Sequence, residues 1–336
     1  MRKISFVVPV YNRPEELREL LESLVAQTAP VFEVLVIEDG SAVTCFSVVE
    51  DFQKQLPLVY FYKENTGPGD SRNYGMSKAT GDFFIILDSD CVLPKHYLKA
   101  INEFLSSHEV GFFGGSDAAH PSFSPLQKAI NFVMTSMLTT GGLRGHTKSL
   151  QKFEPRSFNM GISRSAFEQS GGFGLIHPGE DPDLSIRLWQ LGFESSFVAA
   201  AYVFHKRRIS WSQFHKQVHA FGSVRPILMK RYPAYAKKSF WLPSLFVAGV
   251  LSVILTSLVG WFLPLIVLFN YLLLLFLVAL YRESPLVAFL VIPALFIQMF
   301  GYGIGFLNTS IKLTLSKKPA EELFPHLFFK KTNGAI

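Results

Sequence analysis

Acidic side chains follow two of the apolar segments in the first part of the chain, at the point where each segment ends. Glu38 and Asp39 follow the second of these segments, and Asp88 and Asp90 follow Phe83–Leu87. Two carboxylates so close together repel each other unless a cation lies between them. Mg²⁺ commonly binds one or two carboxylates together with substrate phosphates. An isolated Asp-Ser-Asp triplet would indicate a solvated turn, but at the end of a buried strand it indicates a metal site.

The segments that would position these acids alternate between strand and helix from about Met1 to Ala200. Helical periodicity is clear in Pro14–Ala26, where several leucines share one side. The other expected elements are strands at Ile4–Val10, Phe32–Ile37, Leu58–Tyr62 and Phe83–Leu87, and helices at Val43–Gln55 and Gly69–Ala79. This alternation predicts an α/β fold with a mainly parallel sheet and helices on both faces. Ligands of such sheets bind beyond the carboxyl ends of the strands, where the acids lie.

Short segments of this region occur in an order that is typical of one enzyme family. They are Val7–Asn12, Ile37–Ser41, Asn65–Asn73, Ala79–Asp82, Leu87–Asp90, and Gly171–Phe173 with Glu180-Asp181. On these segments, the chain from about Ile4 to His205 resembles a family 2 glycosyltransferase of the GT-A fold. The family usually has Asp-Asp-Gly-Ser where this chain has Glu38-Asp39-Gly40-Ser41, so the second acid is retained.

The resemblance implies a nucleotide-sugar donor, with a UDP-sugar favoured, and Mg²⁺ or Mn²⁺ as cofactor. Asp39 would accept a hydrogen bond from the base, and Arg72 would approach the nucleotide or its diphosphate. Asp88 and Asp90 would hold the cation, which neutralises the charge that develops as the glycosidic bond breaks. His205 would complete the metal shell, although a lone histidine is more often structural. The other expected donor-binding residues are Pro9, Val10, Tyr11 and Ser89.

The resemblance also implies an acceptor side with its own carboxylates. Asp181 would act as general base and deprotonate the acceptor hydroxyl, whose oxygen then attacks the anomeric carbon with inversion of configuration. Glu180 would support Asp181, and Asp183 would cap the helix expected at Leu184–Leu191. On the sequence alone, acids at a helix start are equally well explained as caps. The expected acceptor-binding residues are Asn159, Gly172 and Phe173.

The second part of the chain has the composition of a membrane domain. From Trp241 to Ile311 the only charged residues are Arg282 and Glu283. Since a spanning helix needs about 20 apolar residues, this region predicts two to three spans, at Trp241–Val259, Trp261–Leu280 and Leu286–Leu307. Before them, apolar residues at helical spacing between Phe214 and Leu228 alternate with basic ones. This amphipathic helix is expected to lie on the cytoplasmic leaflet or to pack on the catalytic domain.

These observations divide the chain into a catalytic domain at 1–210, a juxtamembrane linker helix at 211–239, transmembrane helices at 240–311 and a basic tail at 312–336. Ile4–Val10 is shorter than the apolar core of a signal peptide and is expected to be the first strand. We therefore expect a multi-pass protein of the inner (cytoplasmic) membrane whose catalytic domain faces the cytoplasm. Because much of the net charge of +6 lies beside the membrane segments, membrane lipids rather than nucleic acid are the expected partners.

The class of acceptor is predicted less directly. The Gln-x-x-Arg-Trp segment that processive polysaccharide synthases of the family usually carry is missing after Asp181, which favours transfer of a single sugar. Anchoring favours a lipid-linked or cell-envelope saccharide, because the membrane raises the effective concentration of such an acceptor. The sequence leaves three alternatives open: a polyprenyl-phosphate sugar synthase, which needs no general base; a non-catalytic saccharide-binding scaffold; and a nucleotidyltransferase, which would carry a glycine-rich loop after the first strand.

Overall fold

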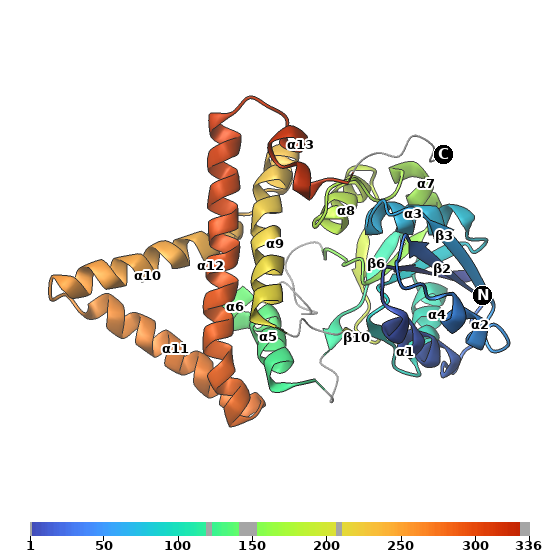
Figure 1. Cartoon of the computed structure of the whole chain (residues 1–336), viewed down its shortest axis with the longest axis horizontal. Coiled ribbons are helices and arrows are strands. Elements are labelled where there is room, and N and C mark those ends of the chain that lie inside the picture. The colour runs from blue at the N-terminus through green and yellow to red at the C-terminus, as the bar shows by residue number, and fades with distance from the viewer. Residues whose placement is uncertain (1, 119–122, 141–152, 206–209, 330–336) are drawn as a thin grey trace. The chain divides into compact units, whose positions relative to one another are not determined.

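The computed structural model describes residues 2–118, 123–140, 153–205 and 210–329. These residues belong to two compact units (Figure 1). The first unit comprises the described parts of Met1–His120, Gly145–Lys206 and Phe328–Ile336, and the second comprises those of Pro121–Arg144 and Arg207–Leu327. The chain therefore passes from one unit to the other four times.

A seven-stranded sheet forms the centre of the first unit, in the order β3-β2-β1-β4-β8-β6-β9. Its strands are β1 (Ile4–Val10), β2 (Glu33–Asp39), β3 (Leu58–Lys63), β4 (Phe83–Leu87), β6 (Phe112–Gly114), β8 (Asn159–Ser163) and β9 (Ser195–Phe197). The first four are parallel to one another, whereas β8 is antiparallel to both β4 and β6. A second, three-stranded sheet has the order β5 (Cys91–Val92), β10 (Val203–His205), β7 (Asp117–Ala118).

Helices cover both faces of the main sheet, as the alternation predicted. The helices of this unit are α1 (Pro14–Val25), α2 (Phe46–Phe52), α3 (Pro68–Lys78), α4 (Tyr97–Ser107), α7 (Arg164–Ser170) and α8 (Glu180–Gln190). Phe6 and Val8 of β1 point into a core formed with α1, α2 and α4. Val7 points to the other face, where α3 lies so close that a side chain at Gly75 would come within 2.5 Å of it. The central strands are thus buried on both sides, which explains their continuous apolar sequences.

The last described residues of the chain return to this first unit. Phe328 forms an antiparallel bridge with Ile176, and the backbone N–H of Phe329 donates to the carbonyl of Leu175 at 2.9 Å. The ring of Phe329 occupies the space above Gly67, since a side chain at Gly67 would come within 2.5 Å of that ring. Gly67 also has φ +96°, a left-handed conformation that glycine adopts without strain.

The second unit is helical, and three of its helices are long and apolar enough to cross a membrane. They are Lys238–Leu258, which includes α10 (Leu242–Leu258), α11 (Leu263–Arg282) and α12 (Pro285–Leu315). Each corresponds to one of the predicted spans, and α12 continues beyond the predicted end at Leu307. Large apolar side chains of α10 and α11 are exposed, for example Leu255 at 65% and Phe269 at 62%, as lipid-facing side chains would be. The other elements are α5 (Pro125–Thr135), α6 (Met137–Thr140), α9 (Trp211–Arg231), α13 (Ala320–Leu323) and the short 3₁₀ helices η1 (Pro233–Tyr235), η2 (Lys238–Trp241) and η3 (Pro325–Leu327).

Glycines let α9 approach α12 closely, and the two helices lie side by side in Figure 1. A side chain at Gly301 would meet Val218 at 2.7 Å, and one at Gly305 would meet the carbonyl of His219 at 2.5 Å. On the opposite helix, a side chain at Gly222 would come within 2.1 Å of the carbonyl of Tyr302. Small residues at this spacing are typical of tightly packed membrane helices. The apolar face of α9, predicted from its periodicity, therefore covers α12.

Candidate active site

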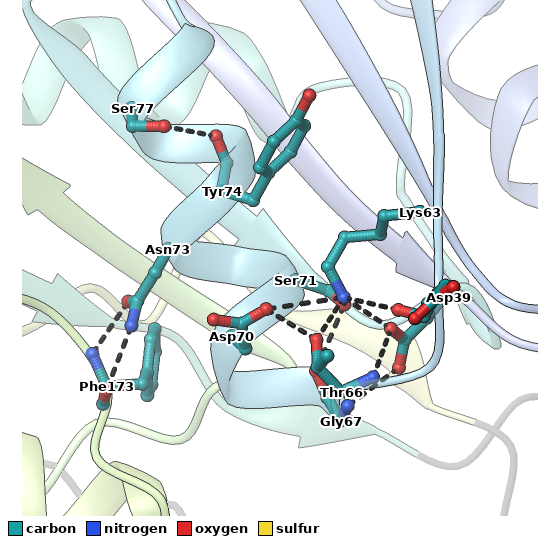
Figure 2. A network of polar contacts seen from close by, with 11 residues as sticks. Asp39, Lys63, Thr66, Gly67, Asp70, Ser71, Asn73, Tyr74, Ser77 and Phe173 are labelled. Carbon is teal, nitrogen blue, oxygen red and sulfur yellow. Dashed lines mark hydrogen bonds and ion pairs between the residues drawn. The ribbon is translucent and has the colours of Figure 1, made fainter. Parts of the chain in front are cut away.

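Asp39, the last residue of β2, is the centre of a polar network at the carboxyl end of the parallel strands (Figure 2). One carboxylate oxygen accepts hydrogen bonds from Lys63 Nζ at 2.6 Å and from the backbone N–H of Thr66 at 3.0 Å, and the other accepts from the N–H of Gly67 at 3.0 Å. Nζ of Lys63, which ends β3, also lies 3.3 Å from a carboxylate oxygen of Asp70. Asp39 is buried, so these donors stabilise its charge and fix the turn that enters α3.

Glu38 shapes the loop after β2. Its fully buried carboxylate accepts hydrogen bonds from the hydroxyl of Ser41, from the backbone N–H of Cys45 at 2.6 Å and from the hydroxyl of Tyr60 at 3.3 Å. Burial and the charge of Glu38 raise the pKa of Cys45 to about 12, so this thiol stays protonated. The glutamate at the position where the family usually has aspartate is therefore structural.

Arg72 of α3 joins residues that the sequence assigned to different functions. Its guanidinium donates to Asp88 at 2.7 Å and to Glu180 at 2.9 Å, and it lies over the ring of Phe173 at 5.2 Å. The Arg72 side chain is 3% exposed. Burial alone would lower the pKa of Arg72, but Asp88 and Glu180 raise it above its ordinary value, so the side chain stays cationic. A single cation thus connects the expected metal acids with the expected catalytic acids.

Asp90 and His205 lie together, as the metal prediction requires. His205 Nε2 is 3.2 Å from a carboxylate oxygen of Asp90, because β10 pairs with β5 in a register that places His205 opposite Cys91. The other oxygen of Asp90 accepts from Arg13 at 2.6 Å. A carboxylate oxygen of Asp90, Sγ of Cys91 and a ring nitrogen of His205 all lie within 4.8 Å of one another.

These donors fit a hard divalent cation. His205 Nδ1 is buried and has no hydrogen-bond partner in the part of the chain that the structure describes. Cys91 is a poor ligand for Mg²⁺ or Mn²⁺, because burial and the neighbouring Asp90 and Asp88 raise the pKa of its thiol well above the ordinary value. Asp90 and His205, with Asp88 two residues before Asp90, are therefore the residues that could hold the ion.

The two acids that begin α8 have environments that shift their pKa values in opposite directions. Burial would raise the pKa of Glu180, but His177 at 3.1 Å and Arg72 lower it to about 2. Burial and the charge of Glu180 raise the pKa of Asp181, although Arg156, 3.6 Å away, opposes this. Adjacent carboxyl groups whose pKa values are pushed apart are typical of acid–base sites, with the more basic group accepting the proton. Asp181 has that property and is 16% exposed.

The glycine-rich segment before α8 is held in place by two side chains that the sequence did not single out for this purpose. Asn73 of α3 donates to the carbonyl of Phe173 at 2.9 Å and accepts from its N–H at 2.7 Å. Arg187 donates to the carbonyls of Ser170 at 2.6 Å and Gly172 at 2.5 Å.

Asp183 has a different position from the one expected. Helix α8 begins at Glu180, so Asp183 lies inside the helix rather than before it. Its carboxylate accepts from Arg187 Nε at 3.0 Å, one turn further along. The expectation that Asp183 caps a helix at Leu184–Leu191 was therefore wrong, and the side chain instead orients the arginine that holds the glycine-rich segment.

The expected acceptor residues are not accessible to an acceptor. Asn159 is fully buried, and its amide accepts from the hydroxyl of Tyr97 at 2.7 Å and donates to the carbonyl of Ala201 at 2.7 Å. The prediction that Asn159 contacts the acceptor is therefore corrected: it is a structural residue between β8 and its neighbours. Gly172 and Phe173 are also buried, with Phe173 packed beneath Arg72.

The remaining expected donor residues lie at the end of β1 and beside Asp88. Tyr11 is 52% exposed, whereas Val10 and Ser89 are buried and Pro9 is partly buried. Tyr11 is thus the one of the four whose side chain is open to a ligand. Asn12, which follows it, has φ 55° and accepts hydrogen bonds from the backbone of residues 42 and 43, which ties this turn to the loop after β2.

The sequence that forms this site is similar to those of known glycosyltransferases. Residues 5–171 match the family model described as Glycosyl transferase family 2. An uncharacterized glycosyltransferase of Rickettsia bellii is 34% identical over 110 residues, which cover 33% of this chain and 16% of that protein. The poly(ribitol-phosphate) beta-N-acetylglucosaminyltransferase TarS of Staphylococcus aureus is 37% identical over 112 residues, 32% of this chain and 20% of TarS. The chain thus spans about a fifth or less of the length of these relatives.

Solved structures show the same fold. The mannosyltransferase PcManGT from Pyrobaculum calidifontis, solved in complex with GDP-Man and Mn²⁺, has a TM-score of 0.61 at 16% identity, and the match covers 90% of this chain and 87% of that one. Staphylococcal TarS 1–349 has a TM-score of 0.50 at 18% identity, covering 94% of this chain and 93% of that one.

Proposed function

Because the chain belongs to the family 2 glycosyltransferases through its domain over residues 5–171, we propose that it transfers a single sugar from a nucleotide-sugar donor to a hydroxyl group, with inversion of configuration. The acceptor is a lipid-linked or cell-envelope saccharide. Two findings support the nucleotide-sugar donor and the kind of acceptor: the similar proteins include a transferase named for poly(ribitol-phosphate) and a structure holding GDP-Man, and the described part of this chain has three helices suited to a membrane.

The observation that carries the proposal is the position of Arg72 between Asp88 and Glu180. Asp90 lies two residues beyond Asp88, and Asp181 directly follows Glu180. Arg72 therefore brings the acids that would face the donor diphosphate next to the acids that would face the acceptor. A displacement reaction needs this proximity, because attacking and leaving oxygens must lie on opposite sides of one carbon.

Asp181 serves as the general base of this reaction. Its raised pKa makes it a better proton acceptor than an ordinary aspartate, while Glu180 remains ionised. As the acceptor oxygen attacks the anomeric carbon, the hydroxyl proton passes to a carboxylate oxygen of Asp181. The bond between the anomeric carbon and the diphosphate oxygen breaks, and the nucleoside diphosphate leaves with the electron pair. Arg72, fixed by its two ion pairs, holds Asp88 and Glu180 in place during this step.

A Mg²⁺ or Mn²⁺ ion bound by Asp90 and His205, with Asp88 beside them, would supply positive charge for the departing diphosphate. Arg13 adds a second positive charge beside these residues, because its guanidinium is paired with Asp90. Asp39 and Tyr11 remain our candidates for contacts with the nucleotide, since both lie at the carboxyl ends of parallel strands.

The test is nucleotide release by the full chain, purified in detergent, with UDP-, GDP- and dTDP-sugars in the presence of Mg²⁺ or Mn²⁺. We expect slow, metal-dependent hydrolysis of one donor, and none in an Asp88→Ala/Asp90→Ala variant. Asp51→Asn, an exposed aspartate in a surface ion pair, is the matched control and should hydrolyse normally. If no nucleotide sugar binds the wild-type protein by calorimetry, the proposed function is wrong.

A further inference from the structure

A basic pocket lies in the second unit, between α9 and the 3₁₀ helix η3. Its volume is about 340 Å³, which is at the lower end of the roughly 300–1,000 Å³ typical of small-ligand sites. The pocket is lined by His215, Lys216, His219, Ala220, Ser223, His326 and Leu327. Three histidines and one lysine thus surround it, and none of the described residues that line it is acidic.

The charged and polar nitrogens of this pocket are available for a ligand. Within the described parts of the chain, the side-chain nitrogens of Lys216 and of the three histidines make no hydrogen bond or ion pair. The His215 and His219 rings lie 6.0 Å apart between centroids. Burial lowers the pKa of His219, and the neighbouring His215 and His326 lower it further. An anion held beside His219 would oppose this effect, because a negative charge favours the protonated form of an imidazole.

The pocket lies where the apolar part of α12 ends. A side chain at Gly301 would come within 3.4 Å of the His215 ring, and one at Gly305 within 2.5 Å of the His219 carbonyl. A helix crosses the roughly 30 Å hydrocarbon core with about 20 residues. Counted from Pro285, where α12 begins, that length reaches the neighbourhood of Gly305. If α12 crosses a membrane from Pro285 onward, the basic side chains would lie at the depth where lipid phosphates meet the hydrocarbon core.

A metal ion explains the pocket less well. His215 and His219 are four residues apart on a helix, a spacing that many zinc sites use. Among the described residues, however, the cluster of metal-ligating side chains close enough to share one ion is that of Asp90, Cys91 and His205. The pocket histidines do not form such a cluster, and Lys216 adds a positive charge that a cation would repel.

We propose that this pocket binds the phosphate group of a membrane-anchored lipid, and that this lipid carries the acceptor. Lys216 and the three histidines would donate hydrogen bonds to the phosphate oxygens. Such bonds are charge-assisted when the donor is a lysine ammonium or a protonated imidazole. The lipid chain would extend along the apolar part of α12. This inference rests on the proposed function for the role of the lipid as acceptor carrier, but the binding itself is measurable without any sugar transfer.

The experiment measures binding of radiolabelled farnesyl phosphate to the full chain in a neutral detergent, with no donor present. We expect saturable binding that unlabelled farnesyl phosphate displaces, and that equal concentrations of farnesol or inorganic phosphate do not. Lys216→Gln, His215→Gln and His326→Gln should each weaken binding by about tenfold, the amount expected for one charge-assisted hydrogen bond. Lys317→Gln removes a cation from an exposed position outside the pocket and should leave binding unchanged.

Each other outcome overturns the inference. Equal competition by inorganic phosphate would mean a site for free phosphate, and equal competition by farnesol would mean that only the apolar chain is recognised. Stoichiometric Zn²⁺ binding that His215→Gln abolishes would make it a metal site. Normal affinity in all three pocket variants would place the lipid elsewhere on the protein.

Nucleotide release measured on the same variants separates this inference from the proposed function. Release should persist in Lys216→Gln, because the pocket is not required for hydrolysis of the donor. If the wild type binds no nucleotide sugar by calorimetry but binds farnesyl phosphate as described, the transferase proposal fails and the lipid pocket stands.

Discussion

Arg72 and Glu180 are 108 residues apart in the chain, yet their side chains form an ion pair of 2.9 Å in which both are almost fully buried, at 3% and 5% exposed. Asp88 completes the arrangement, so that one guanidinium neutralises two carboxylates, one from the end of β4 and one from α8. Because a buried charge is costly without its partner, these three residues stabilise the unit as well as the site.

Replacing Arg72 by Met would leave Glu180 buried without its cation. We expect the free energy of unfolding to fall by about 3–5 kcal/mol, measured by chemical denaturation in detergent. Arg72→Lys keeps the charge but cannot reach both acids with a planar fork, so it should restore only part of the loss. Arg18→Met, which breaks an exposed pair with Asp51, is the control, and it should change the stability far less. Equal effects of the two methionine variants would contradict the structural importance of Arg72.

Replacing Asp181 by Asn removes the group that we expect to accept the proton. The rate of transfer to a hydroxyl acceptor should fall by about 10²–10⁴-fold, while the affinity for the donor stays the same. Calorimetry with the donor and steady-state kinetics with the acceptor separate the two quantities. Full activity of Asp181→Asn would instead favour an acceptor that is already ionised, such as a polyprenyl phosphate.

The rate of transfer should also depend on pH, because the neighbours of Asp181 shift the pKa of this general base. Because burial raises the pKa of Asp181, activity should decline with falling pH at higher pH values than an ordinary aspartate would give. Arg156 lowers that pKa, so Arg156→Gln should move the acidic limb of the pH–rate profile further upward. A shift in the opposite direction, or no shift, would show that Asp181 is not the titrating base.

Binding of the cation should depend on His205 and be independent of Cys91. His205→Ala removes a nitrogen ligand, and we expect the Mn²⁺ concentration for half-maximal nucleotide release to rise by about tenfold or more, by analogy with the roughly 10–100-fold effects of changes around metal sites. Cys91→Ser should leave that concentration unchanged, because the raised pKa of the thiol keeps it neutral. If Cys91→Ser instead raised that Mn²⁺ concentration, the thiol of Cys91 would be a ligand of the ion.

The strand ends are well predicted from the sequence, because continuous apolar runs mark strands that are buried on both faces. These runs alone place Asp39 and Asp88 at one edge of the sheet, where the structure has them. The same reasoning applies to cations and points to Lys63, which ends β3. A search limited to acids misses this lysine, although it is a main partner of Asp39.

Apolar runs and short motifs do not predict contacts between segments that are distant in the sequence. Asn159 has the sequence surroundings of an acceptor loop, but Tyr97, 62 residues away, and Ala201, 42 residues away, enclose its amide. The family resemblance directs Arg72 to the nucleotide, and only the approach of α8 shows that Glu180 competes for it. A short polar motif gives the chemistry of a side chain but not which of several partners it meets.

The return of Phe328 and Phe329 to the first unit has a practical consequence for how this protein can be divided. A fragment that stops after His205 would contain every strand of the main sheet, yet it would leave the turn at Gly67 without the ring that covers it and would lack the bridge to Ile176. Since the chain crosses between the units four times, one proteolytic cut cannot release an intact catalytic fragment. A version limited to the first unit would need linkers in place of both segments of the second unit, residues 121–144 and 207–327, so that residues 328–329 remain attached.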